Sequence, residues 1–288
     1  MEIDVSFDSF CRLYDNEHAC AEQMYQDKWP EGFRCPVCRH TQASVIRTRR
    51  LPLYECRKCR YQASLTTGTV MEKSKTPLVK WFRAIYLLSH GATAVQIANA
   101  IKVTYKTAWL IAHKIRHAIK QIIADTPLTG HVRILESRYG ATSFAAQFST
   151  RAVHHPLIAA ASVSDDGKMV HVRMARVPAS HIFKGIVLKD AYQSFILRHV
   201  ASDADITATY GLYNFARYKP LYSFSRDAVR YLNQTYCGVG LKHLKSYLDE
   251  YSYRHQFASL DQSLAAHLMR QCANRPALPY RQLIKTAA

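Results

Sequence analysis

The sequence predicts a multidomain protein that combines α+β and α/β parts. Three observations lead to this prediction: two closely spaced pairs of cysteines, a following stretch with helical periodicity and no acidic residue, and a second half in which strand-like and helix-like segments alternate. With 288 residues and 48% hydrophobic content, the chain is long enough for a full-sized core and one or two small modules.

The N-terminal segment, residues 1–32, is predicted to be helical. Hydrophobic residues recur at roughly helical spacing over residues 6–28, which favours one or two short helices. Pro30 and Gly32 then end the helical pattern, because neither residue easily continues a helix.

Residues 33–65 carry two Cys-x-x-Cys pairs whose separation, seventeen residues, is typical of a four-thiolate zinc site. Each pair fits a tight turn that directs both sulfurs to one tetrahedral ion. We therefore predict a zinc ribbon with two short strands between the pairs and with structural zinc as its cofactor. The predicted ligands are Cys35, Cys38, Cys56 and Cys59. The other four cysteines, Cys11, Cys20, Cys237 and Cys272, are expected to be small buried hydrophobic residues.

The spacing of hydrophobic residues and the capping signals in residues 76–121 predict three helices. Thr76 is expected to cap the first, with Pro77 at its first position, and Gly91 ends it. The run from Thr93 to Gln96 has the form of a capping box for a short second helix. Thr104 is expected to cap a third helix that continues to about residue 121. A short, tight connection between the second and third helices is typical of a helix-turn-helix.

The distribution of charge favours a polyanionic partner. The formal net charge is +18, and residues 76–121 hold seven Lys or Arg and no acid, while residues 39–60 hold seven against the single Glu55. Double-stranded DNA is the predicted partner; an RNA or a protein partner is a weaker alternative, and isolated charges are often an ordinary solvated face. The candidate DNA-binding residues are Arg47, Arg49, Arg50, Lys102, Thr104, Tyr105, Lys106, Thr107, Lys114 and Arg116.

The sequence offers no apolar run of membrane-spanning length, and its first residues are acidic where a secretion signal would be basic. We expect a cytoplasmic, nucleoid-associated protein with no membrane partner. We also expect it to form a homodimer or a higher homo-oligomer.

Several motifs resemble one known family. They are WPEGFRCPVC at residues 29–38, the second cysteine pair, SLTTGT at residues 64–69, and segments 75–78 and 81–85. Together they resemble the N-terminal half of bacterial insertion-sequence transposases of the DDE type that carry a zinc ribbon. This resemblance implies a ribonuclease-H-like domain, placed here at residues 125–257, followed by a C-terminal tail at residues 258–288. Within the domain, residues 132–140 resemble the family's first strand and residues 239–254 its closing helix, while residues 155–172 predict two strands joined by a turn at residues 164–167. In the family, acidic side chains of this domain hold two divalent metal ions for DNA cleavage and strand transfer.

The catalytic positions that the resemblance implies are not acidic in this chain. Leu135 stands where the family has its first Asp, and Ala208 stands in the place of the second. We therefore predict a degenerate domain with no catalytic residue. The alternative is an active DDE transposase that binds Mg²⁺ through Glu136, Asp203 or Asp205 together with a late acid, either Asp249 or Glu250. That alternative requires these carboxylates to converge on one metal site. We expect Mg²⁺ as a cofactor only if the protein is an active transposase.

Overall fold

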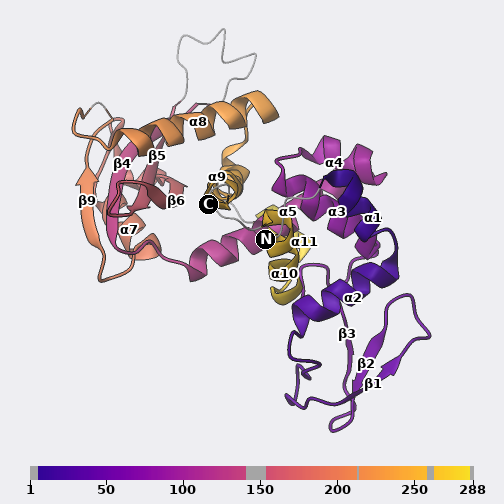
Figure 1. Cartoon of the computed structure of the whole chain (residues 1–288). Coiled ribbons are helices and arrows are strands. Elements are labelled where there is room, and N and C mark those ends of the chain that lie inside the picture. The colour runs from indigo at the N-terminus through magenta and orange to yellow at the C-terminus, as the bar shows by residue number, and fades with distance from the viewer. Residues whose placement is uncertain (1–5, 141–153, 213, 258–262, 286–288) are drawn as a thin grey trace. The chain divides into compact units, whose positions relative to one another are not determined.

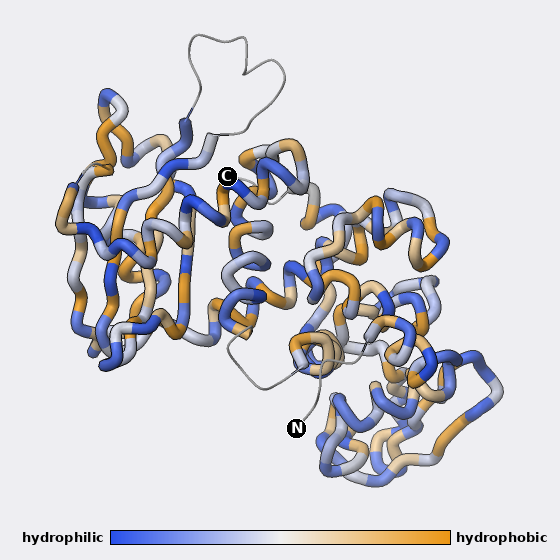
Figure 2. The backbone as a smooth tube through the Cα atoms, turned by 45° about the horizontal axis from the view of Figure 1, so that its top comes forward, coloured by the Kyte–Doolittle hydropathy of each residue, from blue (hydrophilic) through white to orange (hydrophobic). Residues whose placement is uncertain are grey.

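The computed structural model describes residues 6–140, 154–212, 214–257 and 263–285, and its contacts divide the chain into two compact units (Figure 1). Unit 1 comprises residues 1–118 and 261–285, and unit 2 comprises residues 119–260 and 286–288. Unit 1 is therefore assembled from two separate parts of the chain. Hydrophobic and hydrophilic residues are interspersed along the backbone (Figure 2), and no helix among the described residues has the length and apolar composition to cross a membrane.

Unit 1 begins with two capped helices, as the periodicity predicts. Helix α1 spans Phe7–Leu13 and helix α2 spans Glu17–Lys28. The side chains of Ser6 and Asn16 each accept a hydrogen bond from a backbone N–H three residues ahead, so both N-termini have a satisfied cap. Phe10 of α1 packs against the ring of Tyr86, which comes from a later helix of the same unit, with 4.7 Å between the ring centroids.

The ribbon that follows is a three-stranded antiparallel sheet in the order β1-β2-β3. Its strands are Ala43–Ile46 (β1), Leu53–Cys56 (β2) and Gln62–Ser64 (β3). The sequence predicts the first two strands, but β3 lies after the second cysteine pair and was not expected. With strands of only four, four and three residues, the sheet buries too little surface to be stable alone.

Three helices follow the ribbon: α3 (Leu78–Ser89), α4 (Ala94–Ile101) and α5 (Tyr105–Asp125). The capping box of α4 is confirmed, because Thr93 Oγ1 accepts from the Gln96 N–H at 3.3 Å and Gln96 Oε1 accepts from the Thr93 N–H at 2.8 Å. The predicted cap of α3 is wrong. Pro77, not Thr76, occupies the N-cap position, and no side chain caps the helix.

Helix α5 is capped as predicted but is longer than predicted. The Thr107 N–H donates to Thr104 Oγ1 at 3.3 Å. The helix then continues four residues beyond the expected end, to Asp125. Its residues up to Ala118 belong to unit 1, and its last two turns belong to unit 2.

The segment 258–288, predicted to be a C-terminal tail, is not peripheral. It contains α10 (Leu264–Asn274) and α11 (Tyr280–Lys285), and both belong to unit 1. Leu268 and Cys272 of α10 are 1% and 0% exposed. The Cys272 carbonyl accepts a hydrogen bond from the Val70 N–H at 3.0 Å. The amphipathic spacing of α10 makes its inner face part of the core.

Unit 2 is built on a four-stranded sheet in the order β6-β5-β4-β9. Its strands are β4 (His131–Tyr139), β5 (His155–Val163), β6 (Met169–Arg176) and β9 (Asp205–Thr209). The pairs β4–β5 and β5–β6 are antiparallel, whereas β4 and β9 run parallel. The predicted turn between β5 and β6 is confirmed: Gly167, at φ +80°, closes it by donating to the Ser164 carbonyl at 2.8 Å.

Helices cover both faces of this sheet (Figure 1). Helix α7 (Lys189–His199) packs on one face with Val132 and Ile134 of β4, while α8 (Lys219–Tyr236) and α9 (Leu241–Phe257) pack on the other face with Leu135. Before α7 the chain forms a short 3-10 helix at Ala179–His181 and a small hairpin of β7 (Ile182–Phe183) and β8 (Ile186–Val187). The sequence predicts α9, but it misses α7 and α8.

Replacing Leu268 by Ala should destabilise unit 1 by about 2–5 kcal/mol, because it leaves a cavity between α10 and the rest of the core. The measurement is urea unfolding of the full chain, followed by tryptophan fluorescence. Arg270→Ala is the matched control, since Arg270 is exposed and its nearest carboxylate oxygen, on Asp27, lies 4.0 Å away. Equal stability of the two variants would show that α10 is not part of the core.

Candidate metal centre and nucleic-acid interface

Two turns of the same form present the four ribbon cysteines. In the first turn the Cys35 N–H donates to the His40 carbonyl at 2.9 Å, and in the second the Cys56 N–H donates to the Tyr61 carbonyl at 2.9 Å. Arg39 and Arg60 occupy the same place in the two turns, at φ +63° and +61°. Non-glycine residues adopt this left-handed conformation only where the surroundings require it, at a cost of about 1–3 kcal/mol. The two turns are therefore shaped to bring their sulfurs together.

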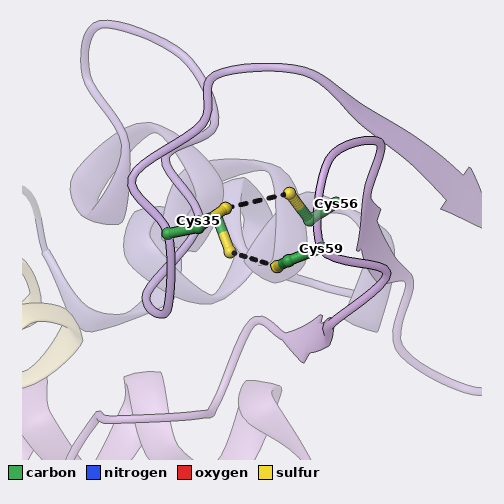
Figure 3. A group of neighbouring side chains, drawn as sticks. Cys35, Cys56 and Cys59 are labelled. Carbon is green, nitrogen blue, oxygen red and sulfur yellow. Dashed lines mark hydrogen bonds between the residues drawn. The ribbon is translucent and has the colours of Figure 1, made fainter.

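The four sulfurs fit one tetrahedral zinc ion. All four Sγ atoms lie within 4.8 Å of one another, with 3.6 Å between Cys35 and Cys59 and 3.5 Å between Cys38 and Cys56. Zn–S bonds of about 2.3 Å in a tetrahedron imply S–S separations of about 3.8 Å. Figure 3 shows the side chains of Cys35, Cys56 and Cys59 pointing toward one another from the two turns. Among the described residues, this is the single group of three or more His, Cys, Asp or Glu side chains close enough to hold a metal.

The turns also favour ionised thiols, which are the form that binds metal. Burial opposes ionisation of Cys35, but the backbone N–H groups of Val37 and Cys38 and the neighbouring thiols outweigh it and lower its pKa to about 6. The pKa of Cys56 is lowered in the same way. The Tyr61 N–H favours ionisation of Cys59, yet burial and the three other sulfurs raise its pKa to about 12. The last proton is therefore held until a cation compensates the accumulated negative charge.

The ribbon is fixed to α2 by one buried ammonium group. Lys28 Nζ donates to the carbonyl oxygens of Ser64, Leu65 and Thr67 at 3.3, 2.9 and 2.6 Å. Burial lowers the pKa of Lys28 to about 8, an effect that nearby Glu72 opposes. A cluster of aromatic rings adds to the contact and consists of Tyr25, Trp29, Phe33 and Tyr54. Helix α2 and the ribbon therefore form one structural piece.

Most of the predicted DNA-binding residues lie on the surface. The connection between β1 and β2 exposes Arg47, Arg49 and Arg50. Arg50 also forms an ion pair, with 3.9 Å between its Nε and Glu17 Oε2. Lys102, Thr104, Tyr105 and Lys106 are exposed where α4 ends and α5 begins, and Thr107 is half-buried. Lys102 ends α4 in the left-handed conformation at φ +52°, and its carbonyl accepts from Lys80 Nζ at 2.9 Å. The chain thus turns sharply between α4 and α5 and exposes the start of α5.

Two predicted DNA-binding residues are placed differently. Arg116 is only 1% exposed, so it lies inside unit 1 and not on a phosphate-binding surface. Its position is explained by spacing, because it follows the fully buried Ala112 by four residues and faces the same side of α5. Lys114 is half-buried, with Nζ 5.9 Å from the centre of the Trp81 ring, and burial lowers its pKa.

The carboxylates of the alternative catalytic set do not converge. Glu136 is 5% exposed and shares its face of β4 with Ile134, which packs against α7; burial raises its pKa, and Arg138 opposes this shift. Asp205 is exposed at the opposite end of the sheet, where its Oδ2 lies 2.6 Å from His131 Nδ1. The register pairs His131 with Asp205, so Glu136 lies five residues, or about 16 Å, along β4 from that pair. Asp203 is exposed in the turn before β9.

The two late acids are also engaged elsewhere. Asp249 and Glu250 of α9 are 1% and 2% exposed. Asp249 accepts a short hydrogen bond from Lys245, and Glu250 Oε1 lies 3.6 Å from Arg254 Nε. Leu135, at the position of the family's first Asp, is 2% exposed and belongs to the hydrophobic core beneath α8 and α9.

The cysteines outside the ribbon follow the prediction in part. Cys20 and Cys272 are buried and Cys11 is half-buried, but Cys237 is exposed at the C-terminus of α8. The supporting role of Lys28 was not predicted. A position in the last turn of a helix is an ordinary one for a lysine, so the sequence carries no local signal for this role.

Residues 15–62 match the family model described as a transposase zinc-ribbon domain. The chain therefore carries a zinc ribbon of the transposase type, and the match begins in front of α2. The chain is also similar to a protein of Halobacterium salinarum described as an uncharacterized protein in transposable element ISH50, with 33% identity over 130 residues. These residues are 43% of this chain and 42% of the relative, so the match spans less than half of either protein. No solved structure matches the chain.

Replacing Cys56 by Ser should abolish stoichiometric zinc binding, because three thiolates and a hydroxyl form a much weaker tetrahedral site. Bound zinc is measured by inductively coupled plasma mass spectrometry on the purified full chain. Cys237→Ser is the control, since Cys237 is exposed and lies far from the ribbon in sequence. One zinc per chain in both variants would contradict the assignment.

Proposed function

We propose that this chain is a transposase-related protein that binds duplex DNA through its zinc ribbon and through a helix-turn-helix formed by α3, α4 and α5. The observation that carries the proposal is the transposase-type ribbon, whose four sulfurs fit one zinc ion and whose β1–β2 connection exposes Arg47, Arg49 and Arg50. The start of α5 supports the helix-turn-helix, because Tyr105 is 55% exposed beside exposed Lys102 and Lys106. Such a helix enters the major groove with its N-terminal end.

We further propose that unit 2 is a ribonuclease-H-like domain that no longer cleaves DNA. The architecture of unit 2 supports the fold, because its sheet of three antiparallel strands and one parallel strand is covered by helices on both faces, as expected for an α/β core. The hydrophobic surroundings of Leu135 support the loss of activity, since neither Leu135 nor Ala208 offers an oxygen ligand to Mg²⁺. The separation of Glu136 from Asp205 speaks against the alternative of an active DDE transposase that uses them.

We also propose that the protein acts in the cytoplasm, associated with the nucleoid, as a homodimer or a higher homo-oligomer. A dimer would present two DNA-binding heads to symmetric half-sites, which is how helix-turn-helix proteins usually gain affinity and register. Analytical ultracentrifugation of the zinc-loaded chain tests the oligomeric state.

DNA affinity should fall steeply with salt, because each neutralised phosphate releases counterions. Replacing both Lys102 and Lys106 by Ala should reduce the slope of log affinity against log salt by about 2, if each lysine contacts one phosphate. The measurement is fluorescence anisotropy with a labelled duplex in a salt series without Mg²⁺. Arg12→Ala is the control, because Arg12 is exposed on α1 of the same unit. A slope that the double replacement leaves unchanged would remove the start of α5 from the interface.

The zinc-loaded chain should not nick a supercoiled plasmid in the presence of Mg²⁺ or Mn²⁺. Gel electrophoresis over a time course provides the measurement, and an unrelated Mg²⁺-dependent nuclease is the positive control. Metal-dependent nicking that Glu136→Gln abolishes and Asp166→Asn leaves intact would instead support the active enzyme. Asp166 serves as the comparison because it lies in the exposed turn between β5 and β6 and pairs with Lys168 at 2.7 Å.

A further inference from the structure

Helix α8 has two chemically distinct faces. Its inner face packs into the core of unit 2 through Leu221, Phe224, Ala228 and Leu232. Lys219, Arg226 and Arg230 are all exposed, and their spacing of seven and four residues places them on one outer face. The distance along the helix from Lys219 to Arg230 is about 16 Å, since each residue advances by about 1.5 Å. The outer face of α8 is therefore a continuous basic stripe.

Nearby acids do not neutralise this stripe as a whole. Among the described residues of α8 and α9, the acids are Asp227, Asp249 and Glu250. Asp227 is half-buried and pairs with Arg230 at 3.3 Å, while Asp249 and Glu250 are buried. Among the residues that the structure describes, Lys219 and Arg226 form no ion pair with a carboxylate, so the accessible charge is positive.

An aromatic side chain projects from the loop in front of this helix. Phe215 is 98% exposed, although hydrophobic side chains of this size are normally covered. Two hydrogen bonds lie beside it: the Ala216 N–H donates to Asn214 Oδ1 at 2.9 Å, and Arg217 Nη1 donates to the Leu212 carbonyl at 2.6 Å. Phe215 therefore exposes its ring next to a segment with local polar contacts.

Arg217, two residues after Phe215, and Arg226 of α8 both lie against the ring of Tyr222. The guanidinium carbon of Arg217 lies 3.6 Å from the centre of the Tyr222 ring, and that of Arg226 lies 5.8 Å from the same ring. These cation–π contacts orient both guanidinium groups while leaving them able to donate hydrogen bonds to anions. The α8 surface, defined as Phe215, Arg217, Lys219, Tyr222 and Arg226, thus combines fixed positive charges with an accessible ring.

We infer that the α8 surface binds single-stranded DNA. Basic side chains along a groove or stripe follow the phosphates of a strand, and an exposed aromatic ring stacks on a base. The ring favours an unpaired strand over a duplex, because base faces inside a duplex are already covered by their neighbours. Lys219 and Arg226 lie about 10 Å apart along the helix, a length that spans about three nucleotides at about 3.4 Å each. This site lies entirely in unit 2 and is independent of the proposed duplex-binding head.

The test uses the full, zinc-loaded chain that carries Lys102→Ala and Lys106→Ala, so that binding by the head contributes little. Fluorescence anisotropy with labelled oligothymidylate reports binding. Phe215→Ala should weaken it about 5- to 150-fold, the range that corresponds to loss of one base–aromatic stack. Lys219→Ala with Arg226→Ala should lower the salt slope by about 1.4, as expected for two lost phosphate contacts on a single strand. Phe215→Trp should retain affinity.

Two matched controls lie on α7, which packs on the other face of the sheet. Leu197→Ala removes a hydrophobic side chain that is 85% exposed, and Arg198→Ala removes an exposed positive charge. Both should bind oligothymidylate as the parent does, and thermal unfolding verifies that every variant is folded.

Three outcomes would overturn the inference. In the first, the Phe215 and Lys219/Arg226 variants bind oligothymidylate with the same affinity as the α7 controls. The second is loss of affinity for a duplex and not for the single strand, which would make the surface a duplex contact. The third is competition by polyglutamate as strong as that by unlabelled oligothymidylate, which would make it a general site for acidic polymers.

Discussion

The convergence of four sulfurs from two turns is the constraint on which the N-terminal part of unit 1 depends. Strands of four, four and three residues cannot hold their register through side-chain burial, so an ion that joins the two turns must fix it. That register places Tyr54 of β2 against the rings of Tyr25 and Trp29, which connect the ribbon to α2. It also sets the exposed arginines between β1 and β2. The order of the ribbon and the geometry of its basic loop thus have one physical origin.

Unit 2 is stabilised by hydrophobic packing on the α8 and α9 side of its sheet. A carboxylate at the position of Leu135 would lie among Leu221, Phe224 and Leu248 and would need a metal ion to compensate its buried charge. A leucine there completes a continuous hydrophobic core on the α8 and α9 side of the sheet. The core on this side of the sheet therefore holds no buried charge at this position.

The sequence predicts those features whose signal is local. The paired cysteines and the capping box at Thr93 are short patterns with a direct physical meaning, and both are present. Helices α8 and α10 are not among the predicted elements, although Leu221, Phe224, Ala228 and Leu232 of α8 recur at helical spacing. Arg116 is buried because it follows Ala112 by about one helical turn, a constraint that its charge alone does not reveal. The carbonyl contacts of Lys28 join residues 36 to 39 positions apart and have no local signal.

The place of α10 in unit 1 bears on how the chain is made. Ribosomal synthesis releases the ribbon and α3 first, but Leu268 and Cys272 reach the core that they complete only after the whole of unit 2 has left the ribosome. A growing chain therefore carries unit 1 with an incomplete core until α10 has been made, and the last helices of the chain close the core that the first ones begin.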